Sequence, residues 1–129
     1  MSFVSTLGIV LLAVAALLLL RQIYFKRQVR HYSVDEVLRK RKFGIPLVLL
    51  DVRTTSENRR GQIPDSLHIP LHELSSRLPE LEPYRHRDIV VYCATGNRSV
   101  IAAHFLQKRG FSAANLRGGF SAWKANPNI

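Results

Sequence analysis

The sequence has a single cysteine, Cys93, among its 129 residues. One cysteine cannot form an internal disulfide, and metal sites built on paired cysteines are excluded. A metal site built on His68 and His72 is also disfavoured. Pro70 lies between them and opposes one continuous helix that would present both side chains to a metal. We interpret these histidines as surface or hydrogen-bonding residues, and we expect no metal and no cofactor.

Charged side chains are absent from residues 3–20. As a helix, this run would be about 27 Å long, close to the hydrocarbon thickness of a bilayer, and core helices of soluble proteins are rarely apolar on every face. A cleaved signal peptide would need basic residues before the run, where only Met1 and Ser2 stand. The Ala-Val-Ala triplet at 13–15 resembles a cleavage site, but four leucines come after it. We expect an uncleaved transmembrane anchor over residues 1–22, with a signal peptide and a buried core helix as alternatives.

Positive charge is absent before the apolar run and abundant after it, at Arg21, Lys26, Arg27 and Arg30. The positive-inside bias then places the rest of the chain in the cytoplasm and a very short N-terminus outside. We therefore expect a single-pass protein of a bacterial inner membrane whose residues 3–20 contact lipid. Residues 23–32 would be a basic juxtamembrane linker.

The formal net charge is +10, and residues 21–44 hold eight Lys and Arg against two acids. A basic segment beside a membrane span is explained by attraction to anionic lipid more simply than by nucleic-acid binding. No nucleic-acid motif supports the second interpretation. We expect no nucleic acid among the partners.

The rest of the chain is long enough for one domain with a core and has no internal repeat. Ser33 and Glu36 fit a capping box at the start of a helix that ends at Gly44. Continuous apolar runs of strand length suit strands buried on both faces of a parallel sheet. The expected order is a strand in 45–53, a short strand around 67–69, a modest helix over 71–81 interrupted by Pro79, a strand over 88–93, a helix over 98–110, a short strand in 112–119 and a helix around 120–125.

Strands that alternate with helices predict an α/β domain with a central parallel sheet flanked by helices on both faces. Ligands of such sheets bind beyond the carboxyl ends of the strands, and Cys93 is the last residue of a predicted strand. A small buried cysteine is the alternative interpretation. Against it, the loop after Cys93 offers backbone N–H groups, Gly96 can take positive φ, and Arg98 adds positive charge. These features favour a reactive thiolate without a partner histidine.

The length of this loop separates two anion chemistries. Cysteine-dependent phosphatases have five residues between the cysteine and the arginine, whereas four residues separate Cys93 from Arg98. The loop is therefore one residue too short to surround a phosphate and suits a smaller sulfane sulfur. Phosphatase or arsenate chemistry is disfavoured, and sulfur transfer through a persulfide is favoured.

From about residue 33 to residue 124, the sequence resembles a single-domain rhodanese-like sulfurtransferase. The residues that carry the resemblance are Asp51-Val52-Arg53, Glu57, Gly61, Ile63-Pro64, Ile69-Pro70, the segment Cys93-Ala-Thr-Gly-Asn-Arg-Ser99, Gly110-Phe111, Leu116, Gly118-Gly119 and Trp123. One segment departs from the pattern, because the family commonly has Gly-His-Ile-Pro-Gly-Ala where this chain has Gly61-Gln-Ile-Pro-Asp65-Ser66. That turn shapes the sheet edge, so the departure concerns a contact surface and not the chemistry.

The resemblance implies a rhodanese-like domain over residues 33–129 with Cys93 as its catalytic residue. The substrate-binding site would be the loop of Ala94, Thr95, Gly96, Asn97, Arg98 and Ser99. A thiosulfate sulfurtransferase (rhodanese) reaction would follow, in which the thiolate takes sulfur from thiosulfate or a similar small anionic donor. The acceptor would be cyanide or a thiol, such as glutathione or a thioredoxin-like protein.

Two questions stay open at this level. A membrane-tethered module that binds a partner without turnover is an alternative from another class, although such a module would not require a thiol. Arg98 is open between substrate contact and loop scaffold. We expect Asp51 and Arg53 to hold neighbouring loops, Trp123 to lie in the core or cap the last helix, and Tyr92 and Phe120 to be packing residues, with Phe120 also a candidate for the pocket rim.

Overall fold

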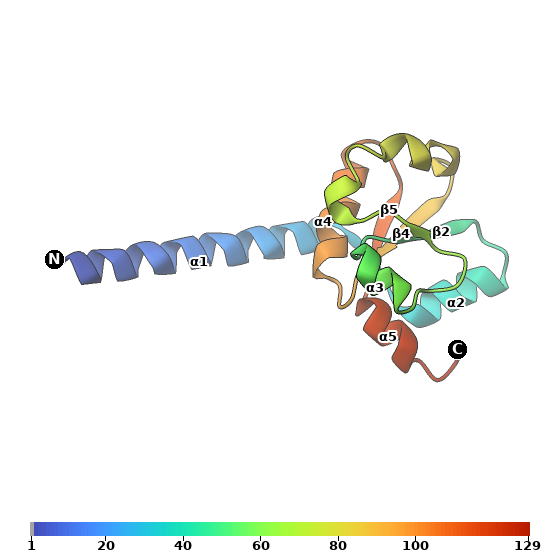
Figure 1. Cartoon of the computed structure of the whole chain (residues 1–129), viewed down its shortest axis with the longest axis horizontal. Coiled ribbons are helices and arrows are strands. Elements are labelled where there is room, and N and C mark those ends of the chain that lie inside the picture. The colour runs from blue at the N-terminus through green and yellow to red at the C-terminus, as the bar shows by residue number, and fades with distance from the viewer. Residues whose placement is uncertain (1) are drawn as a thin grey trace.

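The computed structural model describes residues 2–129 and shows a five-stranded sheet from which one long helix projects (Figure 1). The strands are β1 (Arg30–Tyr32), β2 (Leu47–Asp51), β3 (Leu67–His68), β4 (Asp88–Tyr92) and β5 (Ala113–Leu116). They lie in the order β1-β5-β4-β2-β3, and every neighbouring pair is parallel. The predicted α/β class with a central parallel sheet is confirmed.

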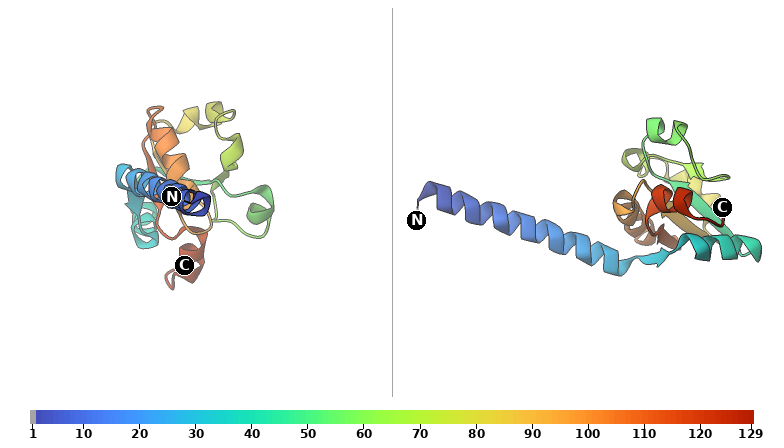
Figure 2. Two further views of the ribbon diagram at one scale, coloured as in Figure 1. Left: turned by 90° about the vertical axis from the view of Figure 1, so that its left-hand side faces the viewer. Right: turned by 90° about the horizontal axis from the view of Figure 1, so that it is seen from below.

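Helices cover both faces of this sheet (Figures 1 and 2). The helical elements are α1 (Phe3–Gln28), α2 (Val34–Lys42), α3 (Thr55–Arg59), the 3-10 helices η1 (Leu71–Glu73) and η2 (Leu78–Tyr84), α4 (Asn97–Gln107) and α5 (Gly119–Ala125). On one face, α4 and the segment containing η1 and η2 pack on the strands. On the other face, α2 and α5 do so.

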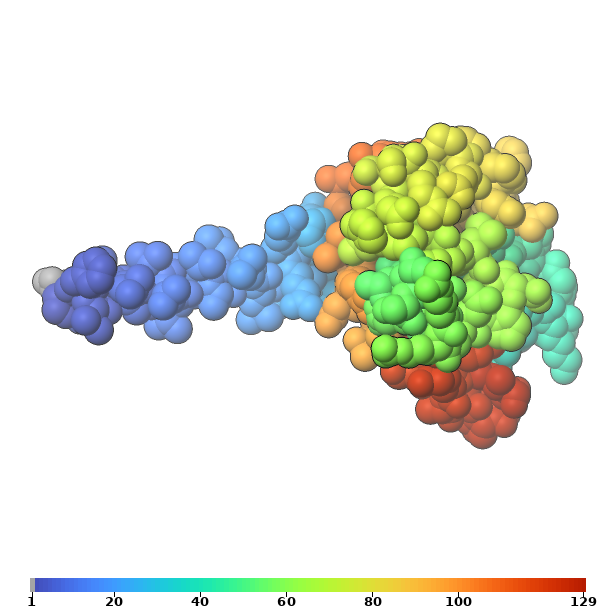
Figure 3. Space-filling view, in the orientation of Figure 1, coloured from blue at the N-terminus to red at the C-terminus, as the bar shows by residue number. Residues whose placement is uncertain are grey.

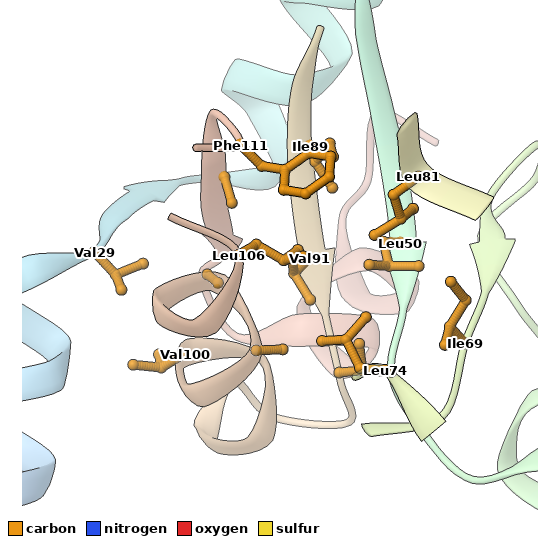
Figure 4. Packing of buried hydrophobic residues seen from close by; sticks show 14 of the residues in the cluster. Val29, Leu50, Ile69, Leu74, Leu81, Ile89, Val91, Val100, Leu106 and Phe111 are labelled. Carbon is orange, nitrogen blue, oxygen red and sulfur yellow. The ribbon is translucent and has the colours of Figure 1, made fainter. Parts of the chain in front are cut away.

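The two faces are built by alternation along the central strands. Leu50 and Val91 point into the first layer, where Figure 4 shows Val91 close to Leu106 of α4. Leu49 and Val90 point into the second layer, together with Trp123 of α5. Because both faces are covered, β2 and β4 are apolar at nearly every position, as the continuous runs in the sequence predict. Trp123 is a core residue, as expected.

The structure differs from the sequence-based prediction at three places. The modest helix predicted over residues 71–81 is instead η1 and η2, with a break at residues 74–77. Pro79 and Pro83 lie in η2 and oppose an α-helix there because neither supplies an N–H group. A strand inside the expected linker was not predicted, yet residues 30–32 form β1 and pair with β5. The short α3 was also missed, although Thr54 and Glu57 form a capping box at its start.

Helix α1 is long and apolar enough to cross a membrane by length and composition. None of its residues is buried in the structure, so it is not a core helix of this fold. The space-filling view shows it extending freely away from the sheet domain (Figure 3). Its C-terminal turns pack on α4, where the rings of Phe25 and His104 lie 4.6 Å apart. Only Val29 separates α1 from β1, so the two elements are directly joined.

The segment that departs from the family pattern is held by the hydroxyl of Tyr92. This buried hydroxyl accepts a hydrogen bond from the backbone N–H of Ile63 at 3.1 Å and donates one to Ser66 at 2.9 Å. The Ser66 hydroxyl in turn donates to the carbonyl of Ile63 at 2.7 Å. Asp65 stands where the family commonly has glycine and takes φ of 63°, the left-handed region that glycine adopts most easily.

The Tyr92→Phe variant tests this arrangement. It removes the only hydroxyl that bonds the buried N–H of Ile63, so the free energy of unfolding should fall by about 1–3 kcal/mol. Urea denaturation measures this value. Tyr84→Phe is the matched control at a partly buried tyrosine outside the network, with an expected change within about 0.5 kcal/mol. Equal losses in the two variants would contradict the role of Tyr92.

Candidate active site

Cys93 lies at the carboxyl end of β4, as predicted, and is one residue beyond its last strand position. The side chain is 1% exposed. The loop then turns through Gly96, whose φ of 117° places it at the N-terminal cap of α4. A side chain on this backbone would be strained, so glycine allows the turn. The strand end, the loop and a helix N-terminus therefore surround one thiol.

Hydrogen bonds converge on the Cys93 sulfur. The backbone N–H of Gly96 donates to it at 3.0 Å, and the hydroxyl of Ser99 lies 3.3 Å away. Burial raises the pKa of the Cys93 thiol. Hydrogen bonds from the Ser99 side chain and from the N–H groups of Ser99, Gly96 and Thr95 outweigh burial, and the net pKa lies below the ordinary value. The loop therefore favours the thiolate, which is the nucleophilic form.

The other side of the loop is fixed by α5. The N–H of Phe120 donates to the carbonyl of Cys93 at 2.8 Å, and the N–H of Ser121 donates to that of Ala94 at 3.1 Å. Gly119 permits this approach, because a Cβ there would lie far inside van der Waals contact with the Cys93 carbonyl oxygen and 2.8 Å from that of Ala94. With their carbonyls held by α5, the loop residues direct their amides toward the sulfur.

Arg98 is paired with a carboxylate of α3. Its guanidinium donates to both oxygens of Glu57, at 2.7 and 2.8 Å, and these hydrogen bonds are the main reason that the pKa of Glu57 falls to about 2. The bidentate pair ties the first turn of α4 to α3 across the mouth of the site. Arg98 therefore supports the loop. The hydrogen bond to Glu57 is the main reason that the pKa of Arg98 is raised, and the nearby Cys93 sulfur raises this pKa to a smaller extent.

A second buried pair shapes the same edge of the sheet. The guanidinium of Arg53 donates to Asp51 at 3.0 and 2.7 Å and to the carbonyl of Gly61 at 2.7 Å. Its charge also lies 4.3 Å from the ring centroid of Phe120. As expected, Asp51 and Arg53 hold neighbouring loops. His68 is a hydrogen-bonding residue with its ring 2.8 Å from the carbonyl of Arg53, and His72 is exposed.

Two cavities flank the loop that follows Cys93. A cavity of about 270 Å³ is lined by Arg53, Glu57, Arg60, Ala94, Phe120, Ser121 and Lys124. A cavity of about 250 Å³ on the α1 side is lined by Lys26, His31, Thr95, Gly96, Asn97, Val100, Asn115, Arg117 and Gly118. Phe120 thus lines a pocket, as anticipated for the rim. Within residues 2–129, no three His, Cys, Asp or Glu side chains are grouped to hold a metal ion.

The predicted site residues line different cavities. Ala94 faces the first cavity, and Thr95 and Asn97 line the second. The side chain of Asn97 turns toward α1, where it accepts a hydrogen bond from Gln22 at 3.4 Å. Three residues around the loop were not predicted. They are Arg60 and Lys124, two cations of the first cavity, and Asn115, which accepts a hydrogen bond from Ser99 at 2.6 Å.

Residues 33–126 match the family model described as a rhodanese-like domain. The chain belongs to the rhodanese-like family. It is 41% identical over 78 residues to a sulfurtransferase of Allochromatium vinosum, a match that covers 60% of this chain and 71% of that protein. It is 35% identical over 79 residues to the thiosulfate sulfurtransferase GlpE of Pseudomonas savastanoi pv. phaseolicola, covering 60% and 73%.

Solved structures agree with this assignment. The crystal structure of a rhodanese-like domain protein from Staphylococcus aureus superposes with a TM-score of 0.69 at 29% identity, and the match covers 74% of this chain and 91% of that one. The family and the fold expected from the sequence are therefore confirmed.

The rhodanese-like loop should depend on Gly119. In Gly119→Ala, the new methyl group meets the backbone of Cys93 and Ala94, so the loop must shift and the free energy of unfolding should fall by about 2 kcal/mol or more. The reaction of Cys93 with a thiol reagent should change as well. Gly44→Ala is the matched control, since Gly44 also has positive φ but has no atom within 4 Å of an added Cβ. An equal loss in both variants would show that backbone strain alone, and not the close approach, requires Gly119.

Proposed function

We propose that this sulfurtransferase moves a sulfane sulfur from thiosulfate or a similar donor to a thiophilic acceptor through a persulfide on Cys93. Sulfurtransferase relatives support sulfur transfer as the class of reaction. The persulfide mechanism rests on one observation: the Cys93 sulfur accepts a hydrogen bond from the N–H of Gly96 at 3.0 Å, within a loop that favours the thiolate.

The first step is attack by the Cys93 thiolate on the outer sulfur of thiosulfate. The bond between the two donor sulfurs breaks, sulfite leaves with its electron pair, and a persulfide anion remains on Cys93. Charge is conserved, because a monoanion and a dianion give a monoanion and a dianion. The loop from Ala94 to Ser99 would hold the persulfide sulfur through the same N–H groups that lower the pKa of the thiol.

The second step returns the enzyme to its starting state. A nucleophile attacks the outer persulfide sulfur, the sulfur–sulfur bond breaks, and the Cys93 thiolate leaves with the electron pair. Cyanide becomes thiocyanate in this step. A thiolate of glutathione or of a thioredoxin-like protein becomes a persulfide.

The cavity beside Ala94 suits an anionic donor. Arg60 and Lys124 both line it, whereas the charges of its other ionic residues are already matched, Arg53 by Asp51 and Glu57 by Arg98. Two cations in a space of about 270 Å³ attract a small dianion. We assign the sulfonate end of the donor to this cavity, with the transferable sulfur directed toward Cys93.

The other chemistries fit the site less well. In a phosphatase, an arginine would have to meet the phosphate, but Arg98 uses both ends of its guanidinium on Glu57. A module that only binds a partner would not need hydrogen bonds directed at a buried thiol. The arrangement around the sulfur therefore favours transfer over both alternatives.

We also propose that α1 anchors the enzyme in a bacterial inner membrane with the catalytic domain in the cytoplasm. Its apolar residues are unburied in the fold, and the cations Arg21, Lys26 and Arg27 follow the apolar run. Lipid would cover the apolar surface that the domain leaves exposed, and the cations would lie at the cytoplasmic surface.

Mass spectrometry and thiocyanate release test the persulfide. After exposure to thiosulfate, the full chain should gain the mass of one sulfur atom on Cys93 and lose it when cyanide is added. Cys93→Ser should gain nothing and form thiocyanate only at the background rate. A wild-type chain that gains no sulfur would favour the binding module, and Cys93-dependent hydrolysis of an aryl phosphate would favour phosphatase chemistry.

Fractionation of cells tests the anchor. The full chain should stay in membranes through alkaline extraction and retain its original N-terminus, whereas a chain lacking residues 2–22 should be released. Protease added to inside-out vesicles should digest the domain, and protease added to spheroplasts should not. An N-terminus that starts just after residue 15 would instead identify a cleaved signal peptide.

A further inference from the structure

A continuous series of hydrogen bonds leads from the Cys93 sulfur to the end of α1. The sulfur contacts the Ser99 hydroxyl at 3.3 Å, and that hydroxyl donates to the side-chain oxygen of Asn115 at 2.6 Å. The amide nitrogen of Asn115 lies 3.1 Å from Nδ1 of His31. Nε2 of His31 lies 2.8 Å from the carbonyl oxygen of Lys26. The series crosses from α4 through β5 and β1 to α1.

The chemistry of the groups fixes the direction of each bond. A carbonyl only accepts, so Nε2 of His31 carries a proton and donates it to Lys26. An amide nitrogen only donates, so in this arrangement Nδ1 of His31 accepts from Asn115. The amide of Asn115 is then oriented with its oxygen toward Ser99.

This orientation decides what Ser99 can offer to the sulfur. The hydroxyl has one proton, and Asn115 receives it at 2.6 Å. While this bond is made, the hydroxyl presents a lone pair toward Cys93, and the thiolate is stabilised only by the backbone N–H groups of the loop. The hydrogen bond from the Ser99 hydroxyl that lowers the pKa of the Cys93 thiol belongs to the other arrangement. Donation from Ser99 to the thiolate requires the proton to leave Asn115.

Protonation of His31 supplies the opposite arrangement. With Nδ1 carrying a proton, the amide of Asn115 must turn so that its oxygen faces His31 and its nitrogen faces Ser99. Ser99 then accepts from the amide, and its own proton is free to bond the sulfur. We propose that His31 and Asn115 are positioning residues for the reaction, which direct the Ser99 hydroxyl either to Asn115 or to the Cys93 sulfur.

The site allows such an exchange. His31 is partly exposed and lines the cavity of about 250 Å³ with Asn115, so protons can reach the ring from solvent. Lys26 of α1 and Arg117 after β5 line the same cavity, while Arg30 and Tyr32 of β1 turn to Asp88 of β4. Around Cys93, the charged groups are Arg98 with Glu57 and, beyond them, Arg53 with Asp51.

Titration of the thiol tests the inference, which rests on the proposed role of Cys93 but does not require turnover. Full-length protein in detergent micelles would carry ¹³C at the cysteine β-carbon, and Cys93 alone would give a signal. Gln in place of His31 can keep both hydrogen bonds but cannot be protonated, so the His31→Gln variant should lock Ser99 onto Asn115. The wild type can take up a proton on His31 when the Cys93 thiol ionises, whereas His31→Gln cannot. The midpoint of the Cys93 titration should therefore rise by about one pH unit in the variant, a roughly tenfold smaller thiolate fraction below the midpoint.

Two further variants separate positioning from support of the fold. In His31→Phe, Asn115 loses its partner and can turn toward Ser99, so the midpoint should not rise above that of the wild type. His86→Gln makes the same chemical change at an exposed histidine and should leave the midpoint unchanged. An unchanged midpoint in His31→Gln, or an equal rise in His31→Phe, would overturn the proposal.

The coupling must also appear from the other end, because linkage between two binding equilibria is reciprocal. In Cys93→Ala, the NMR titration of the His31 ring should move to lower pH than in the wild type, while that of His86 stays in place. A His31 curve that is the same in both proteins would overturn the proposal even if the His31 variants fail to fold. Normal thiol titrations with absent sulfur transfer would instead contradict only the proposed function.

Discussion

The ion pair between Arg53 and Asp51 organises the edge of the sheet at which the candidate active site lies. Arg53 is 4% exposed, and its guanidinium bonds Asp51 and the carbonyl of Gly61 while lying against the rings of Tyr92 and Phe120. Asp51 also accepts from Asn58 of α3. One buried pair thus joins the end of β2, α3, the turn after it and α5. Removing either partner would leave a buried charge without compensation, a change that commonly destabilises a protein by about 3–5 kcal/mol.

The loop after Cys93, the candidate active-site loop, depends on the elements that this pair joins. Its carbonyls are held by the first N–H groups of α5, and its arginine is held by Glu57 of α3. Both helices contact the Arg53–Asp51 pair, α3 through Asn58 and α5 through Phe120. The ionic and polar groups around the loop are largely occupied in holding it, so that backbone amides, which carry no net charge, are left to face the sulfur. The pKa of the buried Cys93 thiol is therefore lowered by hydrogen bonds from the Ser99 side chain and from backbone N–H groups, which outweigh the effect of burial.

The sequence predicted those parts of the molecule that depend on neighbours along the chain. The run before Cys93 predicts a buried strand, and Gly96 predicts the turn. The position of α3 was also readable, since Thr54 and Glu57 have capping-box spacing, but it was missed. The strand β1 could not be predicted from the sequence, because its three residues form no apolar run and their conformation depends on pairing with β5.

The surroundings of the thiol required the structure for the same reason. Asn115 and His31 are far apart in sequence and meet Ser99 only because β1 and β5 are neighbours in the sheet. Arg60 and Lys124 both line the first cavity because α3 and α5 lie at the same edge of the sheet. Arg98 was open between two roles in the sequence, and its bidentate contact with Glu57 identifies it as part of the loop support.

The direct junction between α1 and β1 has a consequence for how partners are met. Val29 is the single residue between them and is packed into the core, so no flexible linker separates the domain from α1. The first residue of α4, Asn97, also bonds Gln22 of α1. In the proposed anchored state, the catalytic loop therefore stays at a fixed height close to the bilayer surface. Its search for a membrane-associated acceptor would be lateral diffusion in two dimensions, and soluble acceptors would have to approach from the side facing away from the lipid.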